Sequence, residues 1–156
     1  MIRGGCKDDS LAMGRVYCEA WKSAYVGIVP QDFLDALTPE MAAPPAERIA
    51  PENCRVYEDG GEVAGLINFV PSGDEGEIRS IYVLPTCWKG GVGRRLFSEA
   101  CGALREAGCG KVFLWVLTEN ASARGFYERM GMSPAGEQTI TIAGKELSET
   151  RYEMKL

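Results

Sequence analysis

The sequence contains no histidine among its 156 residues. This absence excludes Ser-His-Asp and Cys-His catalytic arrangements, histidine-ligated zinc and phosphohistidine chemistry. Any acid–base step must therefore use a carboxylate, tyrosine, lysine, cysteine, the backbone or water. Pairs of the C-x-x-C type are also absent, so we expect neither a disulfide framework nor a bound metal. The cysteines, of which Cys18 and Cys101 fall in helical patterns and are expected to be buried, are Cys6, Cys18, Cys54, Cys87, Cys101 and Cys109.

Long apolar runs and blocks of basic residues are absent as well. The apolar run 112–117 is far shorter than the roughly 18 residues that a membrane helix needs. Asp8 and Asp9 stand where a signal peptide would need apolar residues. The net charge is −5, with no cluster of Lys or Arg that would mark a nucleic-acid surface. We therefore expect a cytoplasmic protein that binds neither membranes nor nucleic acid.

The composition, 46% hydrophobic and 25% charged, is typical of a globular domain, which we assign to residues 1–156. Apolar residues at helical spacing predict a helix from Ser10 to Gly27, a short helix over 31–37, a helix that residues 90–93 open, and one that Asn120 starts. The proline-rich stretch 38–53 predicts an irregular loop. Strands are predicted over 1–7, 54–58, 62–70, 77–84, 111–117, 138–143 and 146–155.

The order of these elements indicates an α/β fold of the mixed α+β kind. Strands and helices alternate in the middle of the chain, and hairpins flank them. This order predicts a mixed sheet with helices on its faces. The strand 111–117 is continuously apolar, as expected for a strand that is buried on both faces.

The segment 81–96 carries the clearest chemical signal, because a strand runs into a glycine-rich turn and then into a helix. Unpaired N–H groups at a helix start, together with glycines that allow close approach, form an anion site. Arg94 and Arg95 stand in the first turn, where the helix dipole disfavours cations unless an anion lies opposite. Since arginine grips phosphate with a pair of hydrogen bonds, we expect a phosphate group here.

Two common phosphate motifs do not fit this segment. The dinucleotide fingerprint G-x-G-x-x-G read from Gly91 places Leu96 at its third glycine. The P-loop needs Lys and then Ser or Thr after its last glycine, whereas Arg94 and Arg95 follow Gly93. The segment therefore supports neither a dinucleotide nor a nucleoside triphosphate.

Two segments together resemble the GNAT superfamily of acetyl-CoA-dependent N-acetyltransferases. The family's pyrophosphate loop, Gln/Arg-x-x-Gly-x-Gly/Ala, is matched by Gly91 and Gly93, with Trp88 in place of Gln or Arg. Its second signature, Asn-x-x-Ala-x-x-Phe-Tyr-x-x-x-Gly-Phe, is matched at Asn120, Ala123, Phe126, Tyr127 and Gly131, with Met132 as the last residue. The match covers about residues 76–132. It implies a mostly antiparallel sheet of six to seven strands with helices on both faces and a central splayed parallel pair.

The resemblance implies acetyl-CoA as the cosubstrate, in a cleft between the strand ending near Leu84 and the strand 111–117. In the family, backbone groups of the first strand pair with the pantetheine arm, which corresponds to Tyr82 and Val83. Asn120 corresponds to a residue that contacts the same arm, although Asn is also a common N-cap. The residues expected to bind the pyrophosphate are Lys89, Gly90, Gly91, Val92, Gly93, Arg94 and Arg95.

Tyr127 corresponds to the family's tyrosine that donates a hydrogen bond or proton to the departing sulfur of CoA. Because tyrosine titrates near 10 and a thiol near 8.5, full proton transfer would be uphill by about 2 kcal/mol. A hydrogen bond to the developing thiolate is therefore favoured. Glu77 is the first candidate for the base that neutralises the amine, with Glu75 and Glu119 as alternatives. Some family members need no dedicated base.

The implied reaction is direct attack of a primary amine, most simply that of a small molecule, on acetyl-CoA. A protein N-terminus as acceptor, a hydroxyl acceptor, a longer acyl chain and a non-catalytic acyl-CoA sensor remain alternatives. A covalent route through Cys87 or Cys109 lacks an activating partner in the sequence. Trp21 and Tyr25 either line the acceptor pocket or belong to the core, where Phe126 is also expected. Family members often dimerise, so a homodimer is a further alternative.

Overall fold

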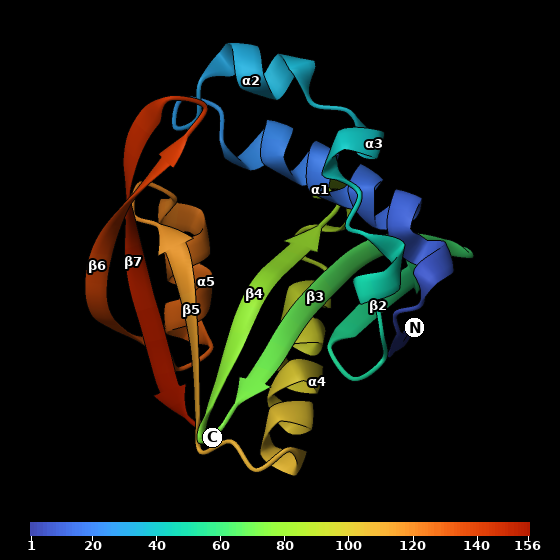
Figure 1. Ribbon diagram of the computed structural model, residues 1–156, viewed down its shortest axis with the longest axis vertical. Coiled ribbons are helices and arrows are strands. Elements are labelled where there is room, and N and C mark those ends of the chain that lie inside the picture. Colours follow the sequence, from blue (N-terminus) through green and yellow to red (C-terminus); the bar gives the residue numbers. More distant parts are fainter.

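The computed structural model describes residues 1–156 and contains one seven-stranded sheet (Figure 1). The strand order is β1-β2-β3-β4-β5-β7-β6, and only β4 and β5 run parallel. The predicted mixed and mostly antiparallel sheet is thus confirmed. The strands are β1 (Ile2–Gly4), β2 (Cys54–Asp59), β3 (Glu62–Ser72), β4 (Glu75–Val83), β5 (Lys111–Leu117), β6 (Ser133–Ile142) and β7 (Lys145–Lys155).

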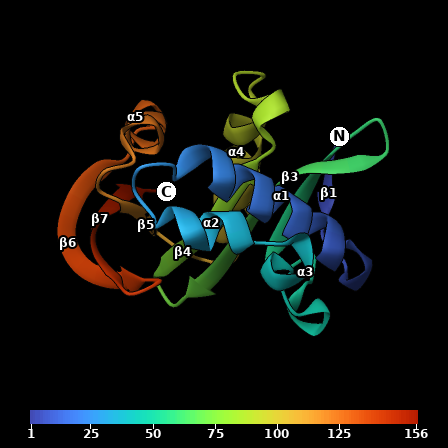
Figure 2. The ribbon, with the colours of Figure 1, turned by 90° about the horizontal axis from the view of Figure 1, so that it is seen from above.

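Helices cover both faces of the sheet (Figure 2). Neighbouring residues of a strand point to opposite faces, and Leu66 and Ile67 of β3 accordingly join two different hydrophobic clusters. Leu66 packs beneath α1, whereas Ile67 packs beneath α4 and α5. None of the helices is long and apolar enough to cross a membrane. The helices are α1 (Ser10–Ala24), α2 (Gln31–Ala36), α3 (Pro39–Ala42), α4 (Val92–Glu106) and α5 (Ala121–Arg129), with short 3₁₀ turns at Lys7–Asp9, Ala46–Arg48 and Pro85–Cys87.

The parallel strands β4 and β5 separate soon after they meet (Figure 1). They pair only from Glu75 opposite Lys111 to Glu77 opposite Phe113. The pairing of β3 with β4 then shifts at Arg79, which has no partner residue on β3. Since a bulge bends its strand and increases the twist, it turns β4 away from β5. The expected central splayed pair is present, and the side of β4 beyond Glu77 that faces β5 has no strand partner.

Two local predictions were wrong. The stretch 38–53 is not wholly irregular, because Thr38 caps α3 by accepting a hydrogen bond from the Met41 N–H at 3.3 Å, with Pro39 at the first helical position. The strand predicted from residue 138 begins at Ser133. Pro134 and Gly136 hid this start, since both are poor strand residues; the structure accommodates them at a register shift on an edge strand.

The prediction that β5 is buried on both faces was also wrong. Val112, Leu114 and Val116 are buried under α4 and α5. Phe113 and Trp115 on the opposite face are only partly buried, because the divergence of β4 leaves that face beside a cavity. By contrast, Cys18 and Cys101 are buried as expected, and all six cysteines are free thiols.

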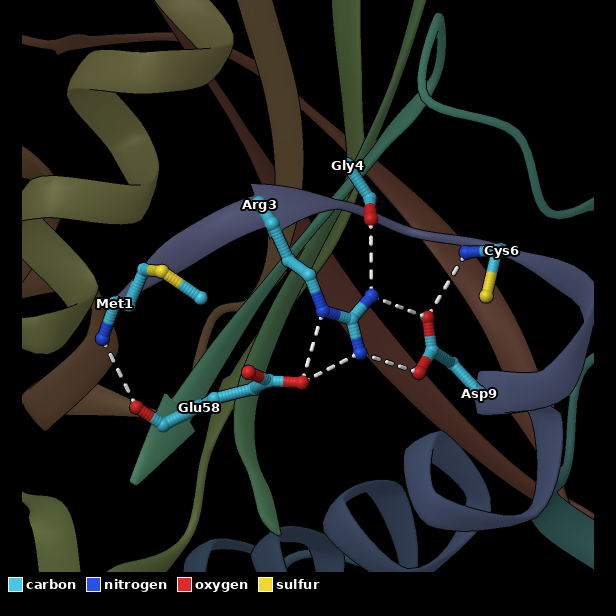
Figure 3. Close-up of polar contacts among 6 residues, drawn as sticks. All are labelled: Met1, Arg3, Gly4, Cys6, Asp9 and Glu58. Atoms are coloured by element: carbon cyan, nitrogen blue, oxygen red, sulfur yellow. Dashed lines mark hydrogen bonds and ion pairs between the residues drawn. The ribbon is translucent and has the colours of Figure 1, made fainter. Parts of the chain in front are cut away.

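A partly buried ion network connects β1 to β2 and to the start of α1 (Figure 3). The Arg3 guanidinium donates to both carboxylate oxygens of Asp9 at 2.8 Å and to Glu58 Oε1 at 2.8 Å. Asp9 Oδ2 also accepts from the Cys6 N–H at 2.9 Å. The Arg3 hydrogen bond, followed by the backbone bond from Cys6, holds the pKa of Asp9 below its ordinary value although burial opposes this. The network therefore stabilises the edge of the sheet on the α1 side.

Candidate active site

The divergence of β4 and β5 creates a cavity of about 920 Å³ that reaches from the N-terminus of α4 to the β6–β7 hairpin. Its lining comes from α1, β4, the glycine-rich turn, α5 and the strands β5 to β7. Most of the expected binding residues meet here. The residues of the expected set that line the cavity are Tyr82, Val83, Lys89, Gly91, Val92, Gly93, Arg94, Asn120 and Tyr127.

The start of α4 has the features of an anion site. Gly91 is the N-cap residue with a left-handed φ of 78°, and a Cβ added there would meet no atom within 4 Å. The first turn contains no acidic residue, so its unpaired N–H groups and the side chains of Lys89 and Arg94 leave this end of the cavity positive. An anion such as a pyrophosphate can therefore approach the backbone closely.

Two residues of the turn lie outside the cavity lining. The Gly90 N–H donates to the Cys87 carbonyl at 3.4 Å. The Arg95 guanidinium lies over the Tyr57 ring, 5.6 Å from its centroid, and borders a separate shallow pocket with Arg94 and Ser98. The structure therefore brings together the amides of the first helical turn with Lys89 and Arg94, but directs Arg95 elsewhere.

Trp88 has a role in the turn that the sequence did not reveal. Its side chain is 48% exposed, and its indole N–H donates to the Val83 carbonyl at 2.8 Å. This bond links the glycine-rich turn directly to the end of β4. The residue that departs from the family's Gln/Arg thus orders the wall of the cavity without contributing a charge.

Tyr127 of α5 projects into the protein interior and is only 8% exposed. Its ring packs against Phe126 at 5.4 Å and Tyr152 at 6.3 Å between centroids. Burial, and to a lesser extent the neighbouring Tyr82, raises the pKa of Tyr127 well above the ordinary value of 10. Its hydroxyl therefore remains protonated at neutral pH and is available as a donor to a group in the cavity.

Asn120 and Phe126 each serve the fold as well as the cavity. The Asn120 side chain caps α5 by accepting from the Ala123 N–H at 3.2 Å. Phe126 packs edge-on against Phe97 of α4 with 6.5 Å between centroids. Both residues also line the cavity. The expectation that Phe126 belongs to the core therefore describes only part of its surroundings.

The far end of the cavity has an aromatic wall. Trp21 and Tyr25 of α1 pack edge to face at 4.8 Å, and the Tyr25 and Tyr82 hydroxyls lie 3.3 Å apart. The Trp21 indole N–H is buried without a hydrogen-bond partner, yet it lies close enough to Tyr82 to offset part of the burial-driven rise in the Tyr82 pKa. Trp115 of β5 lines the same cavity. Trp21 and Tyr25 therefore line the pocket and also pack against the small cluster around Leu34.

The carboxylates expected as bases are not part of the cavity lining. Glu77 pairs with Arg79 at 3.3 Å, and Glu75 forms ion pairs with Arg151 and Lys111 at 3.4 and 3.9 Å. Neither carboxylate lines the cavity, and Glu119 is exposed outside it. The one acidic residue in the lining is Glu149 of β7. The alternation along β7 places it on the same face as buried Leu147, a signal that could have identified it from the sequence.

Comparison with known proteins identifies the family. The model of the Acetyltransferase (GNAT) family matches residues 15–132. The chain belongs to the GNAT family of acetyltransferases. It is 27% identical over 154 residues to the uncharacterized N-acetyltransferase YuaI of Bacillus subtilis strain 168, which covers 95% of this chain and 88% of YuaI. The expected membership and the assignment as an acetyltransferase are thus confirmed.

Two solved GNAT structures are similar in fold. The PaiA N-acetyltransferase of Thermoplasma acidophilum, in complex with coenzyme A, superposes with a TM-score of 0.81 at 19% identity over 100% of this chain and 98% of that one. YncA of Salmonella typhimurium, whose structure contains acetyl-CoA, gives a TM-score of 0.71 at 19% identity over 99% and 92% of the two chains. These similarities confirm the GNAT fold with its splayed central strands.

Proposed function

We propose that this GNAT enzyme transfers an acetyl group from acetyl-CoA to a primary amine of a small molecule by direct attack. The observation that carries the proposal is one continuous cavity. It joins the positive N-terminus of α4, the unpaired edge of β4 and the Tyr127 hydroxyl. The similar PaiA and YncA structures contain coenzyme A and acetyl-CoA, which supports acetyl-CoA as the cosubstrate.

The residues at the α4 end suit the pyrophosphate of acetyl-CoA. The N–H groups of Gly91, Val92 and Gly93 would bind its oxygens, while Lys89 and Arg94 would balance its charge. Gly90 would support the turn, and Arg95 would act only from outside the cavity. A larger residue at Gly91 would disturb this cradle, because the left-handed backbone conformation disfavours any side chain.

The pantetheine arm would lie along β4, where strand pairing with β5 is missing. Backbone groups of Tyr82 and Val83 would pair with the amides of the arm, as a further strand would. The Asn120 side chain, which caps α5 and lines the cavity, would contact the same arm. An N–H of β4 would also polarise the thioester carbonyl during attack.

Tyr127 would stabilise the departing thiolate by donating a hydrogen bond. Since burial raises its pKa, full proton transfer is even less favourable than for an ordinary tyrosine. Glu77, the base that the resemblance implies, does not line the cavity and forms an ion pair with Arg79. It would therefore accept the proton of the amine only through a chain of water molecules. The amine can also lose its proton to solvent before it attacks.

The cover over the acceptor end supports a small acceptor. Residues between α1 and α2 cross to the β6–β7 hairpin, where Lys145 Nζ donates to the Ile28 carbonyl at 2.8 Å. Val29 and Leu34 pack there against Leu117 and Leu147. This cover leaves less room for a protein chain than for a small amine.

The test is release of free thiol from acetyl-CoA in the presence of small amines, peptides with free N-termini, and no acceptor. We expect release with at least one small amine and acetylated product by mass analysis. Binding of acetyl-CoA by calorimetry without turnover on any acceptor would instead support an acyl-CoA sensor. Turnover on peptides alone would support a protein N-terminal acetyltransferase.

A further inference from the structure

The acceptor end of the cavity contains a carboxylate, that of Glu149, which has no role in the proposed acetyl transfer. Glu149 is partly buried and is the only acid in the lining. Gln138 donates to Glu149 Oε1 at 2.9 Å. None of the ion pairs in the protein includes Glu149. A carboxylate that faces a cavity without a cationic partner is suited to a cation from the ligand.

The walls around Glu149 also favour a cation attached to an apolar chain. Trp21, Tyr25, Tyr82 and Trp115 present aromatic rings, which attract cations over their faces. Ile140 and Ile142 of β6 add an aliphatic surface. Four basic residues also line the cavity: Lys89 and Arg94 at the α4 end, Arg129 on α5, and Arg79, which Glu77 engages. Glu149 therefore gives the β6–β7 end the opposite charge to the α4 end.

Glu149 lies away from the site proposed for bond formation. Tyr127 belongs to the hydrophobic cluster under α4 and α5. Glu149 instead lies opposite Leu117 of β5, and Leu117 packs with Leu147 and Val29 in the cluster beneath the segment between α1 and α2. A cation at Glu149 is thus a different group from the amine that attacks beside Tyr127.

We infer that Glu149 is a specificity-determining residue that binds a second positive charge on the acceptor, so that the enzyme prefers alkyl diamines to monoamines and amino acids. The inference rests on the proposed function and names the acceptor class of that same site. The attacking nitrogen lies near Tyr127, and the aromatic and isoleucine side chains contact the methylene groups between the two nitrogens. The distal ammonium pairs with the carboxylate of Glu149.

Three four-carbon amines test this assignment: 1,4-diaminobutane, butylamine and 4-aminobutyrate. Each carries a primary amine at one end, and the far end is an ammonium group, an uncharged methyl group and a carboxylate, respectively. We expect kcat/KM for thiol release to fall in that order, with at least a tenfold advantage of the diamine over butylamine that appears mainly in KM. Glu149→Gln should remove this advantage and leave butylamine unchanged, and Glu149→Asp should restore part of it. Glu146→Gln, on the same strand but outside the cavity, is the matched control.

A binding measurement gives a readout that is independent of turnover. In the presence of coenzyme A, calorimetry should show diaminobutane binding at least tenfold more tightly than butylamine, and Glu149→Gln should abolish the difference. Equal use of all three amines, or an equal loss for all three in Glu149→Gln, would overturn the inference while leaving acetyl transfer intact. Acetyl-CoA that binds but releases no free coenzyme A thiol with diaminobutane as the acceptor would also overturn it. Failure to bind acetyl-CoA would overturn the proposed function itself.

Discussion

At the scale of single residues, the Tyr127 hydroxyl can be removed to test its part in the reaction without disturbing the packing of the ring. The ring is packed between Phe126 and Tyr152, but the hydroxyl makes no hydrogen bond within the protein. Tyr127→Phe should therefore preserve folding and acetyl-CoA affinity. If the hydroxyl stabilises the thiolate, kcat should fall by about 10²-fold, within the usual range for a positioned acid.

For Tyr127→Phe, steady-state thiol release measures kcat, and calorimetry with acetyl-CoA measures the affinity for acetyl-CoA. Phe126→Leu serves as a packing control, because it replaces the neighbouring aromatic ring with a smaller apolar side chain and removes no polar group. Turnover at the wild-type rate in Tyr127→Phe would show that the hydroxyl has no part in the reaction.

Asp9 illustrates how one buried carboxylate makes stability depend on pH. Its side chain is 9% exposed, and Arg3 holds its pKa below the ordinary value near 3.8. A depressed pKa contributes stability at pH values above the unfolded pKa, and this contribution is lost as the pH falls through the folded pKa. Asp9→Asn should therefore cost about 2 kcal/mol at pH 7, the scale of charged hydrogen bonds.

Urea unfolding of wild type and Asp9→Asn between pH 7 and pH 3 checks this dependence. The difference between them should narrow below about pH 4, where the unfolded carboxyl becomes protonated. Asp8→Asn provides the control, since Asp8 is exposed and forms no ion pair. A difference that stays constant over the whole range would show that the charge of Asp9 is not what stabilises the network.

At the scale of elements, the glycines of α4 have opposite roles. Gly91 adopts a φ of 78° at the N-cap, whereas Gly102 lies within the helix, and a Cβ there would meet no atom within 4 Å. Gly91→Ala should destabilise by about 1 kcal/mol through backbone strain. Gly102→Ala should stabilise by about 0.5–1 kcal/mol, because alanine favours the helix.

Thermal unfolding and acetyl-CoA titration distinguish the two variants. Each kcal/mol corresponds to about 2–4 °C in Tm for a chain of this size. Gly91→Ala should lower Tm and weaken acetyl-CoA binding, while Gly102→Ala should raise Tm and leave binding unchanged. Unaltered binding in Gly91→Ala would argue against close approach of the pyrophosphate to this turn.

Local patterns made some elements predictable and left others hidden. The strand–glycine turn–helix of 81–96 and the helix capped by Asn120 depend on neighbouring residues, so the sequence predicts them directly. The surroundings of Trp21 and Tyr25 instead depend on the bulge at Arg79, which separates β4 from β5. Both strands lie far from α1 in the sequence. The alternation along β7 does place Glu149 on the face of Leu147, but only the folded cavity shows that no other acidic residue lines it.

At the scale of the whole molecule, the sheet consists of two halves joined mainly at one end. β4 pairs with β5 over three residue pairs, near which Glu75, Lys111, Arg151 and Glu153 form an ion cluster. At the other end, the segment between α1 and α2 bridges to the β6–β7 hairpin through Ile28 and Lys145. A ligand in the cavity therefore contacts both halves and should hold them together.

Acetyl-CoA should accordingly raise the free energy of unfolding and order β4 as well as the glycine-rich turn. A ligand at 100 times its Kd adds about 2.7 kcal/mol to the folded state, which corresponds to about 5–10 °C in Tm. Hydrogen exchange should slow in β4 beyond Glu77, where the backbone groups that face β5 lack a strand partner, and at the start of α4. Exchange between Glu75 and Glu77 should change little, because those residues already pair with β5. Protection confined to α4, with none along β4, would show that the pantetheine arm does not complete the sheet between its two halves.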